Sequence, residues 1–446
     1  MKIIIAGAGD IGFHLAKLLS HEKHAITLID QKQETLDNAN SQLDVFTIKG
    51  DSSSLDILQQ AGAEECKLFL AVTTSEKNNL MSAILAKKMG AKQTIARVNS
   101  DEYLCAEYRE MFKDLGIDKL ISPQKLAAIE IQRLVKENEL TDVFHFENGQ
   151  ISAIGITVDD DSKLVNLSLQ EIGKQYEKYS LRVVAILRGD HTIIPRGSTT
   201  IKRGDHVYIL TNHANISYIA SILGKARQEI KNIMILGGKK LGYITTKILQ
   251  DDYNLTVVES CKDTCKFLTE RLDNALVIQA DPSNVQILKE EGLERMDAVI
   301  ALMANTESNI IACLMADKLG VNKTIALVDN SDYIHISQNI GVDTLINKKL
   351  IAANNIFRYV RKGNVKAIAG LHGVDAEVIE FVIKKNNRIT KHPLRDLHFP
   401  KQALIGGVIR GDESFVPNGD LQLAKGDKVI VFTKNEAIYR VENFFR

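Results

Sequence analysis

The chain has 446 residues, 45% of them hydrophobic, and at about 100–200 residues per domain this length predicts two to four domains. Lys plus Arg and Asp plus Glu both number 56, so no overall basic excess points to nucleic acid or an anionic membrane as a partner. The longest apolar runs, such as residues 298–304, are far shorter than the roughly 18 residues of a membrane span, and no signal-peptide pattern opens the chain, so we expect a cytoplasmic protein.

A glycine motif lies between the first predicted strand and the first predicted helix. Residues 3–5 are isoleucines, a short β-branched run that suits a strand buried in a parallel sheet. Gly7, Gly9 and Gly12 follow as G-x-G-x-x-G, and apolar residues then continue at helical spacing. In such a turn the first glycine permits the bend, the second lets backbone amides approach a pyrophosphate, and the third lets the helix lie close to the strand. The candidate nucleotide-binding segment comprises Gly7, Ala8, Gly9, Asp10, Ile11 and Gly12.

The second predicted strand, residues 25–29, is followed by Asp30. A carboxylate at this place can accept hydrogen bonds from both ribose hydroxyls and would repel a 2′-phosphate, so NAD(H) is favoured over NADP(H). A glycine-rich turn by itself can serve packing alone. Here the strand, the helix and the aspartate after the second strand all occur in the order that a dinucleotide-binding unit requires, which favours nucleotide binding over a purely structural role.

Strands and helices continue to alternate beyond Asp30. The pattern predicts a helix over residues 31–41, a strand over 45–48, a helix over 55–61 and a strand over 68–72. This is the pattern of a doubly wound parallel sheet, in which ligands bind at the carboxyl ends of the strands. The polar residues at those ends join Asp30 as candidates for the binding crevice: Asp51, Ser52, Thr73 and Thr74.

Other polar residues are expected near the same edge of the sheet. Asn78 and Asn79 begin the next helix, where capping is favoured over lining the crevice. Arg97 interrupts the apolar fifth strand, residues 95–98. A guanidinium there requires an anion, which is either a ligand phosphate or a protein carboxylate.

A connecting helix and a small module follow the first sheet. Residues 116–121 predict a last short strand, and Pro123 begins a helix that continues to about residue 138, with apolar residues on more than one face. We therefore expect this helix to be buried beyond its own domain. From Thr141 onward, short alternating strands predict a separate α+β module, over residues 143–147, 151–158, 181–188, 192–194 and 206–210.

The whole pattern then repeats. Residues 233–237 match residues 3–7, and Asp281 matches Asp51, both at an offset of 230. In the small module Pro195 matches Pro417 at an offset of 222. We interpret the chain as a tandem duplication and predict the α/β class, with two Rossmann-like doubly wound parallel-sheet domains, each followed by a small α+β domain. The expected units are 1–121, the connecting helix 122–140, 141–226, 231–347, the connecting helix 348–362, and 366–446.

The two copies differ at the positions expected to contact a ligand. Lys239 stands at the position of Gly9, Glu259 at that of Asp30 and Leu327 at that of Arg97. Lysine adds bulk where a pyrophosphate would approach, although its ammonium could attract phosphate and a glutamate could hold a ribose. The second site is therefore predicted to be altered or degenerate. Its candidate residues are Gly237, Glu259 and Asp281.

This arrangement resembles the RCK, or KTN, family of potassium-transport regulators, in the tandem form of a peripheral Trk-type uptake subunit. The resemblance covers essentially the full length and is carried by the 7–12 turn, Asp30, Gly50-Asp51, Thr73 and Arg97. Pro195 and Gly204-Asp205 look like the family's C-terminal subdomain. Lys239 and Leu327 depart from the pattern.

The resemblance implies a gating assembly at the cytoplasmic face of the inner membrane. The implied partner is a membrane potassium channel or transporter subunit, the implied assembly is a homotetrameric ring, and the implied ligands are NAD(H) or the adenine nucleotides ATP and ADP. We expect nucleotide held by Gly9, Asp30 and Arg97 to bias the angle between neighbouring nucleotide-binding units. The connecting helices, the second over residues 349–361, would carry that bias to the membrane partner.

Two other classes of function remain open. An NAD-dependent oxidoreductase would use the same first domain but needs an acid or base beside the nicotinamide. The sequence offers no such set and no nucleophile pairing, metal-ligand spacing or P-loop, so neither catalytic nor metal residues are assigned. A structural ring protein with relic sites is disfavoured by the intact first motif.

Overall fold

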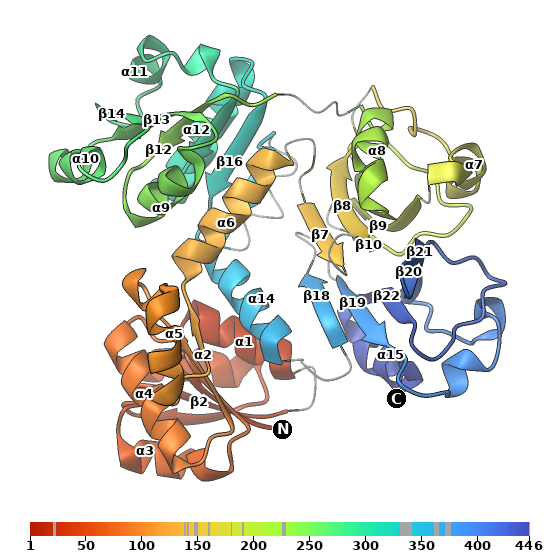
Figure 1. Ribbon diagram of the computed structural model, residues 1–446, viewed down its shortest axis with the longest axis horizontal. Helices are drawn as coiled ribbons and strands as arrows, with labels where there is room; N and C mark the ends of the chain where they lie inside the picture. The colour runs from red at the N-terminus through yellow and green to blue at the C-terminus, as the bar shows by residue number, and fades with distance from the viewer. Residues whose placement is uncertain are drawn as a thin grey trace.

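Four β-sheets form the framework of the protein. The computed structural model describes residues 1–20, 24–137, 140, 142–146, 150–158, 161–179, 181–189, 191–224, 229–330, 341–360, 365–370 and 376–445. Two sheets have six strands and two have five. Figure 1 shows the two large sheets with their helices on one side of the molecule and the two small sheets on the other.

The first large sheet is parallel, with strand order β3-β2-β1-β4-β5-β6. Its central strand β1 is an apolar run whose isoleucines, Ile3 to Ile5, are fully buried because helices cover both faces. The strands are β1 (Lys2–Ala6), β2 (Ala25–Asp30), β3 (Phe46–Lys49), β4 (Leu68–Ala71), β5 (Gln93–Arg97) and β6 (Lys119–Ile121). The helices are α1 (Asp10–Ser20), α2 (Gln33–Gln42), α3 (Leu55–Gln60), α4 (Glu76–Met89) and α5 (Ala106–Asp114), of which α5 was not predicted.

The second large sheet repeats this order as β14-β13-β12-β15-β16-β17. The agreement confirms the predicted duplication of a doubly wound α/β fold. The strands are β12 (Asn232–Leu236), β13 (Asn254–Glu259), β14 (Ala275–Gln279), β15 (Ala298–Ala301), β16 (Lys323–Leu327) and β17 (Thr344–Ile346). The helices are α9 (Lys240–Leu249), α10 (Lys262–Thr269), α11 (Val285–Glu290) and α12 (Thr306–Lys318).

The small sheets are antiparallel, with orders β10-β9-β11-β8-β7 and β18-β19-β22-β20-β21. The first module contains β7 (Asp142–Phe146), β8 (Ile151–Thr157), α7 (Leu169–Gln175), β9 (Arg182–Arg188), β10 (His191–Ile193), β11 (His206–Thr211) and α8 (Ile216–Ile222). The second contains β18 (Val365–Gly370), β19 (Ala376–Val382), β20 (Ala403–Arg410), β21 (Glu413–Phe415), β22 (Lys428–Lys434) and α15 (Ile438–Phe445).

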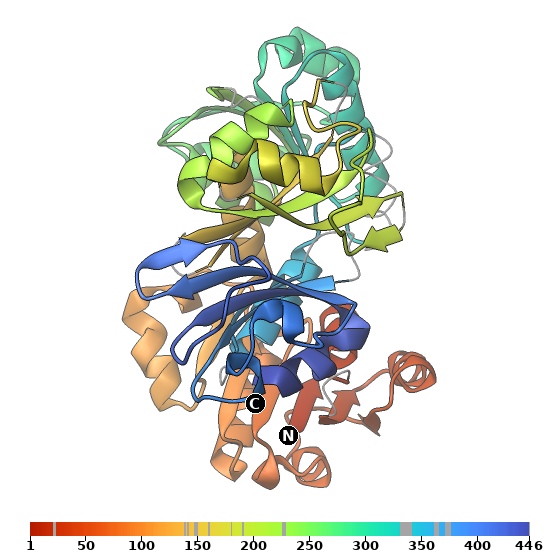
Figure 2. The same cartoon turned by 90° about the vertical axis from the view of Figure 1, so that its right-hand side faces the viewer.

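The two small sheets pack against each other, one above the other in Figure 2. Their shared apolar cluster joins Tyr208 and Leu210 of the first module to Val378 and Phe432 of the second. Gly406 permits the close approach, because a Cβ there would lie 2.2 Å from Cδ1 of Leu210. The small modules therefore link the two halves of the chain on this side.

Each connecting helix packs on the large unit of the other half. Helix α6 (Pro123–Lys136) lies on α9, helix α14 (Lys348–Val360) lies on α1, and the two helices also contact each other. Ile131 of α6 is buried in the core of the second large sheet, and Ile356 of α14 in that of the first. The predicted burial of the first helix beyond its own domain is confirmed. Predicted element ends at residues 138, 147 and 361 lie outside the described residues.

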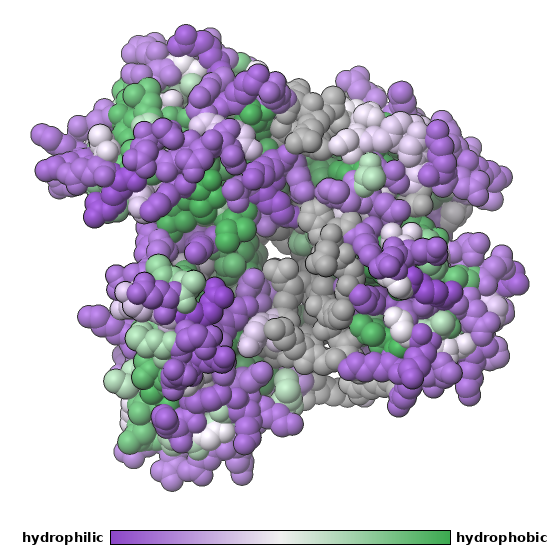
Figure 3. Space-filling view, in the orientation of Figure 1, coloured by the Kyte–Doolittle hydropathy of each residue, from purple (hydrophilic) through white to green (hydrophobic). Residues whose placement is uncertain are grey.

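Polar side chains cover most of the face seen in Figure 3, and apolar side chains gather along α6 where it lies on α9. None of the described helices is both long enough and apolar enough to cross a bilayer.

Candidate functional site

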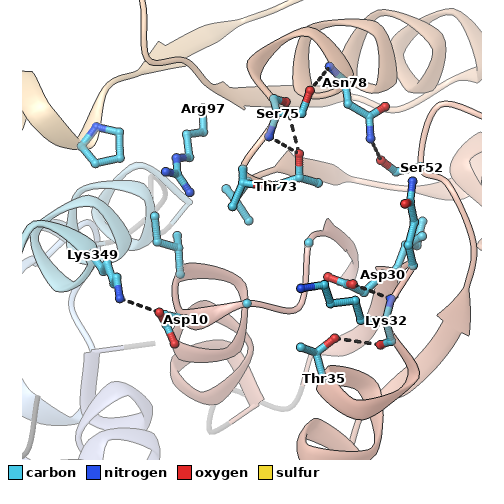
Figure 4. A pocket seen from close by; sticks show the side chains of 18 of the residues that line it. Asp10, Asp30, Lys32, Thr35, Ser52, Thr73, Ser75, Asn78, Arg97 and Lys349 are labelled. Atoms are coloured by element: carbon cyan, nitrogen blue, oxygen red, sulfur yellow. Dashed lines mark hydrogen bonds and ion pairs between the residues drawn. The ribbon is translucent and has the colours of Figure 1, made fainter. Parts of the chain in front are cut away.

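A cavity of about 520 Å³ opens at the carboxyl edge of the first sheet, where the strand order reverses between β1 and β4. This reversal is the place where doubly wound sheets bind ligands. Figure 4 shows side chains from several strand ends converging on this space. The predicted residues that line it are Gly7, Gly9, Asp10, Ile11, Asp30, Ser52, Thr73, Thr74 and Arg97.

The three glycines of the turn have different surroundings. Gly7 has φ of +104°, and a Cβ there would lie 2.9 Å from the backbone nitrogen of Thr73. A Cβ on Gly12 would lie 1.8 Å from the carbonyl oxygen of Gly7. A Cβ on Gly9 would meet nothing within 4 Å. Gly7 and Gly12 are therefore required by packing, whereas Gly9 borders open space in which a ligand can approach the backbone.

Asp30 joins the end of β2 to the glycine turn. Its Oδ2 accepts a hydrogen bond from the backbone N–H of Ala8 at 2.7 Å, and its Oδ1 accepts one from that of Lys32 at 2.9 Å. Each carboxylate oxygen can accept more than one hydrogen bond, and the half-buried side chain still borders the cavity. The carboxylate is thus fixed in place and able to accept from a ribose hydroxyl.

Arg97 lies at the end of β5 and points into the cavity from the side opposite Asp30. Burial lowers the pKa of its guanidinium, and its Nε is buried without a hydrogen-bond partner. Within the described part of the chain no carboxylate pairs with it. Of the two anions that the sequence allowed, the geometry favours a ligand phosphate over a protein carboxylate.

The predicted capping role of Asn78 and Asn79 is wrong. Ser75 caps α4, since its Oγ accepts from the backbone N–H of Asn78 at 3.3 Å. Asn79 instead joins two strand ends, accepting from the backbone N–H of Thr73 at 2.9 Å and donating to the carbonyl of Arg97 at 2.9 Å. The side chain of Asn78 lines the cavity.

Three predicted site residues of the first half do not line the cavity. Ala8 contributes its backbone N–H to Asp30, and Gly12 is buried behind the turn. Asp51 is used in a local turn, where Oδ1 accepts from the backbone N–H of Ser53 at 2.9 Å. Hydrogen bonds from Ser53 also lower the pKa of this carboxyl. Asp281 repeats the same turn in the second half, accepting from the N–H of Ser283 at 2.9 Å.

Two lining residues come from the other half of the chain. Lys348 and Lys349, at the start of α14, border the cavity beside Pro123 and Gln124 of α6. Nζ of Lys349 lies 2.6 Å from Oδ2 of Asp10. No local pattern predicted these residues, because only the packing of α14 on α1 brings them to the cavity. Other lining residues not predicted are Ile29, Gln31, Lys32, Thr35, Gly50, Val72 and Ser75.

The corresponding turn of the second half keeps its packing, and the acidic residue beside it is enclosed. Gly237 has φ of +101°, and a Cβ on Gly242 would lie 2.0 Å from the carbonyl oxygen of Gly237. Glu259 is 4% exposed, and its two carboxylate oxygens accept from the N–H groups of Gly238 and Cys261, both at 2.8 Å. Its carboxylate is therefore bound within the fold rather than directed at a crevice.

Comparison with known proteins assigns both kinds of unit. The TrkA-N domain matches residues 3–123 and 233–348, and the TrkA-C domain matches residues 154–224 and 378–446. The Trk system potassium uptake protein TrkA homolog of Archaeoglobus fulgidus is 32% identical, with 100% of both chains covered. The Trk system potassium uptake protein TrkA of Haemophilus influenzae is 30% identical, with 100% of this chain and 99% of that protein covered.

Solved structures share the fold at low identity. The GsuK channel bound to NAD matches with a TM-score of 0.60 and 13% identity, covering 100% of this chain and 78% of that one. The GsuK RCK domain matches with a TM-score of 0.59 and 13% identity, covering 100% of this chain and 94% of that one. Together with the domain matches, the full-length relatives confirm the family resemblance drawn from the sequence. The chain belongs to the TrkA family of Trk system potassium uptake proteins.

Proposed function

We propose that this chain is the nucleotide-binding regulatory subunit of a potassium uptake system. The names of its full-length relatives support a role in potassium uptake. The observation that carries nucleotide binding is the cavity of the first half. There the open backbone at Gly9, the carboxylate of Asp30 and the guanidinium of Arg97, with which no carboxylate of the described residues pairs, face one space. These are groups suited to a pyrophosphate, a ribose and a further phosphate.

NAD(H) is the proposed ligand, with ADP and ATP as the related alternatives. The fixed carboxylate of Asp30 can accept a hydrogen bond from a free ribose hydroxyl, whereas it would repel the negative charge of a 2′-phosphate. The GsuK structure that shares this fold is described as bound to NAD. The second half is proposed to contribute little binding, since Glu259 is enclosed and Leu327 replaces the arginine.

A regulatory role is proposed in place of the oxidoreductase alternative. The residues that line the cavity, all from the described part of the chain, include no histidine, cysteine or tyrosine to transfer a proton. The carboxylates of Asp10 and Asp30 are engaged with Lys349 and with backbone N–H groups. Among all described residues of the chain, no group of three or more His, Cys, Asp or Glu side chains is placed so that it could hold a metal ion.

The proposed mechanism assigns nucleotide binding to residues 1–121 and transmission to the two connecting helices. A ligand shifts a conformational equilibrium only by binding one state more tightly than the other. Helices α6 and α14 lie between the large units and lead into the small modules, so a change at the cavity would alter the angle between those units. The proposed partner is a membrane potassium channel or transporter subunit, contacted from the cytoplasmic face by a homotetramer.

Calorimetric titration of the purified chain with NADH, NADPH, ATP and ADP tests this function. We expect NADH or an adenine nucleotide to bind, and NADPH to bind at least about tenfold more weakly. At 100 times the dissociation constant the bound form would be about 2.7 kcal/mol more stable. Potassium uptake by cells should then follow the same nucleotide. Absence of binding by all four ligands, or steady oxidation of NADH, would overturn the proposal.

A further inference from the structure

A lysine of the second half lines the first cavity beside the start of α1. Lys349 is the second residue of α14, and its Nζ lies 2.6 Å from Oδ2 of Asp10 and 3.9 Å from Oδ1 of Asp329. Asp10 is the first residue of α1, and Asp329 follows strand β16 of the second half. Figure 4 shows the ammonium of Lys349 directed at Asp10 at the start of α1. One ion pair thus spans the two halves at the candidate site.

The start of α14 is held in place by a capping side chain and by the packing of the helix on α1. Oδ1 of Asn347 accepts from the backbone N–H of Lys349 at 3.0 Å and from that of Leu350 at 3.1 Å. Farther along the helix, Ala353 and Ile356 are buried in the same apolar cluster as Leu15 of α1. The lysine head can therefore change its partner while the helix remains docked.

The charges at this end of the cavity favour such a change of partner. The open side of Gly9 and the first turn of α1 define where backbone amides can approach a phosphate. The carboxylate of Asp10 stands at the same helix end and is 71% exposed, so an incoming phosphate would be repelled by it. The side chain of Lys349 is 30% exposed beside both, and a phosphate with two negative charges is a stronger partner for an ammonium than one carboxylate.

We propose that a ligand phosphate takes Lys349 from Asp10, so that the second half of the chain completes the nucleotide site of the first half. This inference rests on the proposed function and identifies the ligand class as a nucleoside diphosphate or polyphosphate. Lys349 makes affinity depend on the number of phosphates, because adenosine has no phosphate with which the ammonium could pair.

Calorimetry with adenosine, AMP, ADP and ATP tests this inference on the full chain. Lys349→Gln should weaken ADP binding roughly tenfold and leave adenosine binding unchanged, because only the phosphate contact is lost. Lys349→Arg should retain most of the ADP affinity. Asp10→Asn should strengthen ADP binding by a few-fold, since a competing and repelling carboxylate is removed. The matched control is Lys247→Gln, an exposed lysine of α9 that does not line the cavity.

The outcomes separate this inference from the proposed function. Equal ADP affinity in the unaltered chain and in Lys349→Gln would overturn the role of Lys349 and leave nucleotide regulation standing. Loss of adenosine binding along with ADP binding, not restored by Lys349→Arg, would assign Lys349 to helix packing and also overturn it. Failure of the unaltered chain to bind any of the four compounds would overturn both proposals.

Discussion

In both large units the same two glycines hold strand and helix together. Gly7 and Gly237 adopt φ of +104° and +101°, and Gly12 and Gly242 would each place a Cβ within 2.0 Å of a backbone oxygen. Between them the units differ, because Gly9 has an open side whereas Lys239 occupies the same position in the repeat. The comparison separates glycines that the fold requires from the glycine that a ligand requires.

The acidic residue at the end of the second strand shows the same separation. Asp30 and Glu259 both accept from the backbone of the glycine turn, so each helps to fix that turn. Asp30 is half-buried and borders the cavity, whereas Glu259 is 4% exposed. A residue at position 238 larger than glycine would collide with Leu268 and approach Cβ of Glu259 to 3.2 Å. In the second half the carboxylate has become part of the packed fold.

The largest expected effect follows from copying the second half into the first. Gly9→Lys fills the open side of the turn while leaving Gly7 and Gly12 unchanged, so the fold should persist and pyrophosphate binding should be lost. We expect NADH or ADP affinity to fall by about a hundredfold or more, since several charge-assisted hydrogen bonds are blocked together. Calorimetry measures the affinity, and the melting temperature without ligand is the control. Retained affinity would contradict the role given to Gly9.

The next prediction concerns the contact between α1 and α14. His14 of α1 faces Asn354 of α14, and burial, followed by the charge of Lys17, lowers its pKa from 6.5 to about 4. The repeat has Ile244 at this position, buried against α6. Because the folded state binds the proton less well, its stability is fully present above pH 6.5 and is lost as the pH falls through the window from 6.5 toward 4.

Between pH 6.5 and pH 5 the loss should amount to roughly 2 kcal/mol. His14→Ile copies the second half and should remove this part of the acid sensitivity. Melting temperatures of the two proteins at pH 7 and pH 5 provide the measurement. The same decrease on acidification in both proteins would show that His14 is not the group responsible.

A smaller effect on nucleotide affinity is expected from Arg97→Leu, a further substitution that copies a residue of the second half into the first. Arg97→Leu places at the end of β5 the residue that stands at Leu327, and it removes a half-buried guanidinium whose Nε has no hydrogen-bond partner among the described residues. Nucleotide affinity should fall roughly tenfold, the value of one charge-assisted contact. Without ligand the protein should be as stable or more stable, because the cost of burying the charge disappears. A marked loss of stability without ligand would indicate a structural partner for Arg97.

The sequence predicted the fold and most of the first crevice because both depend on local patterns. Buried strands, the glycine turn and the residues at strand ends can each be predicted from nearby residues. Because the chain is duplicated, the same patterns occur twice in the sequence. Helix α5 was missed because its residues are mostly polar and exposed. The contribution of Lys348 and Lys349 was missed because no sequence pattern near residue 349 indicates that this segment contacts α1. Tertiary packing alone places them there.

The role of Asn79 was mistaken for a related reason, and the burial of Glu259 was not predicted. An asparagine in the first turn of a helix suggests a cap, but Asn79 bonds to Thr73 just beyond β4 and to Arg97 at the end of β5. Asn309 repeats the arrangement with Met303 and Leu327. Glu259 stands at a position where a carboxylate suggests a ribose ligand. Only the structure shows that this carboxylate, which accepts from Gly238 and Cys261, is also enclosed, with 4% of the residue exposed.

The smallest effect is expected from the reverse exchange, Lys239→Gly in the second half. This change restores the glycine motif of the turn, and if the lysine were the sole obstacle the second crevice would then bind nucleotide. We expect no binding to appear, because Glu259 remains enclosed and Leu327 offers a phosphate no charge. The experiment is best done in the Gly9→Lys background, where the first site is expected not to bind nucleotide. ADP and NADH are titrated into the double variant. Binding in the double variant would show that a single side chain, and not the enclosed carboxylate, separates the two halves.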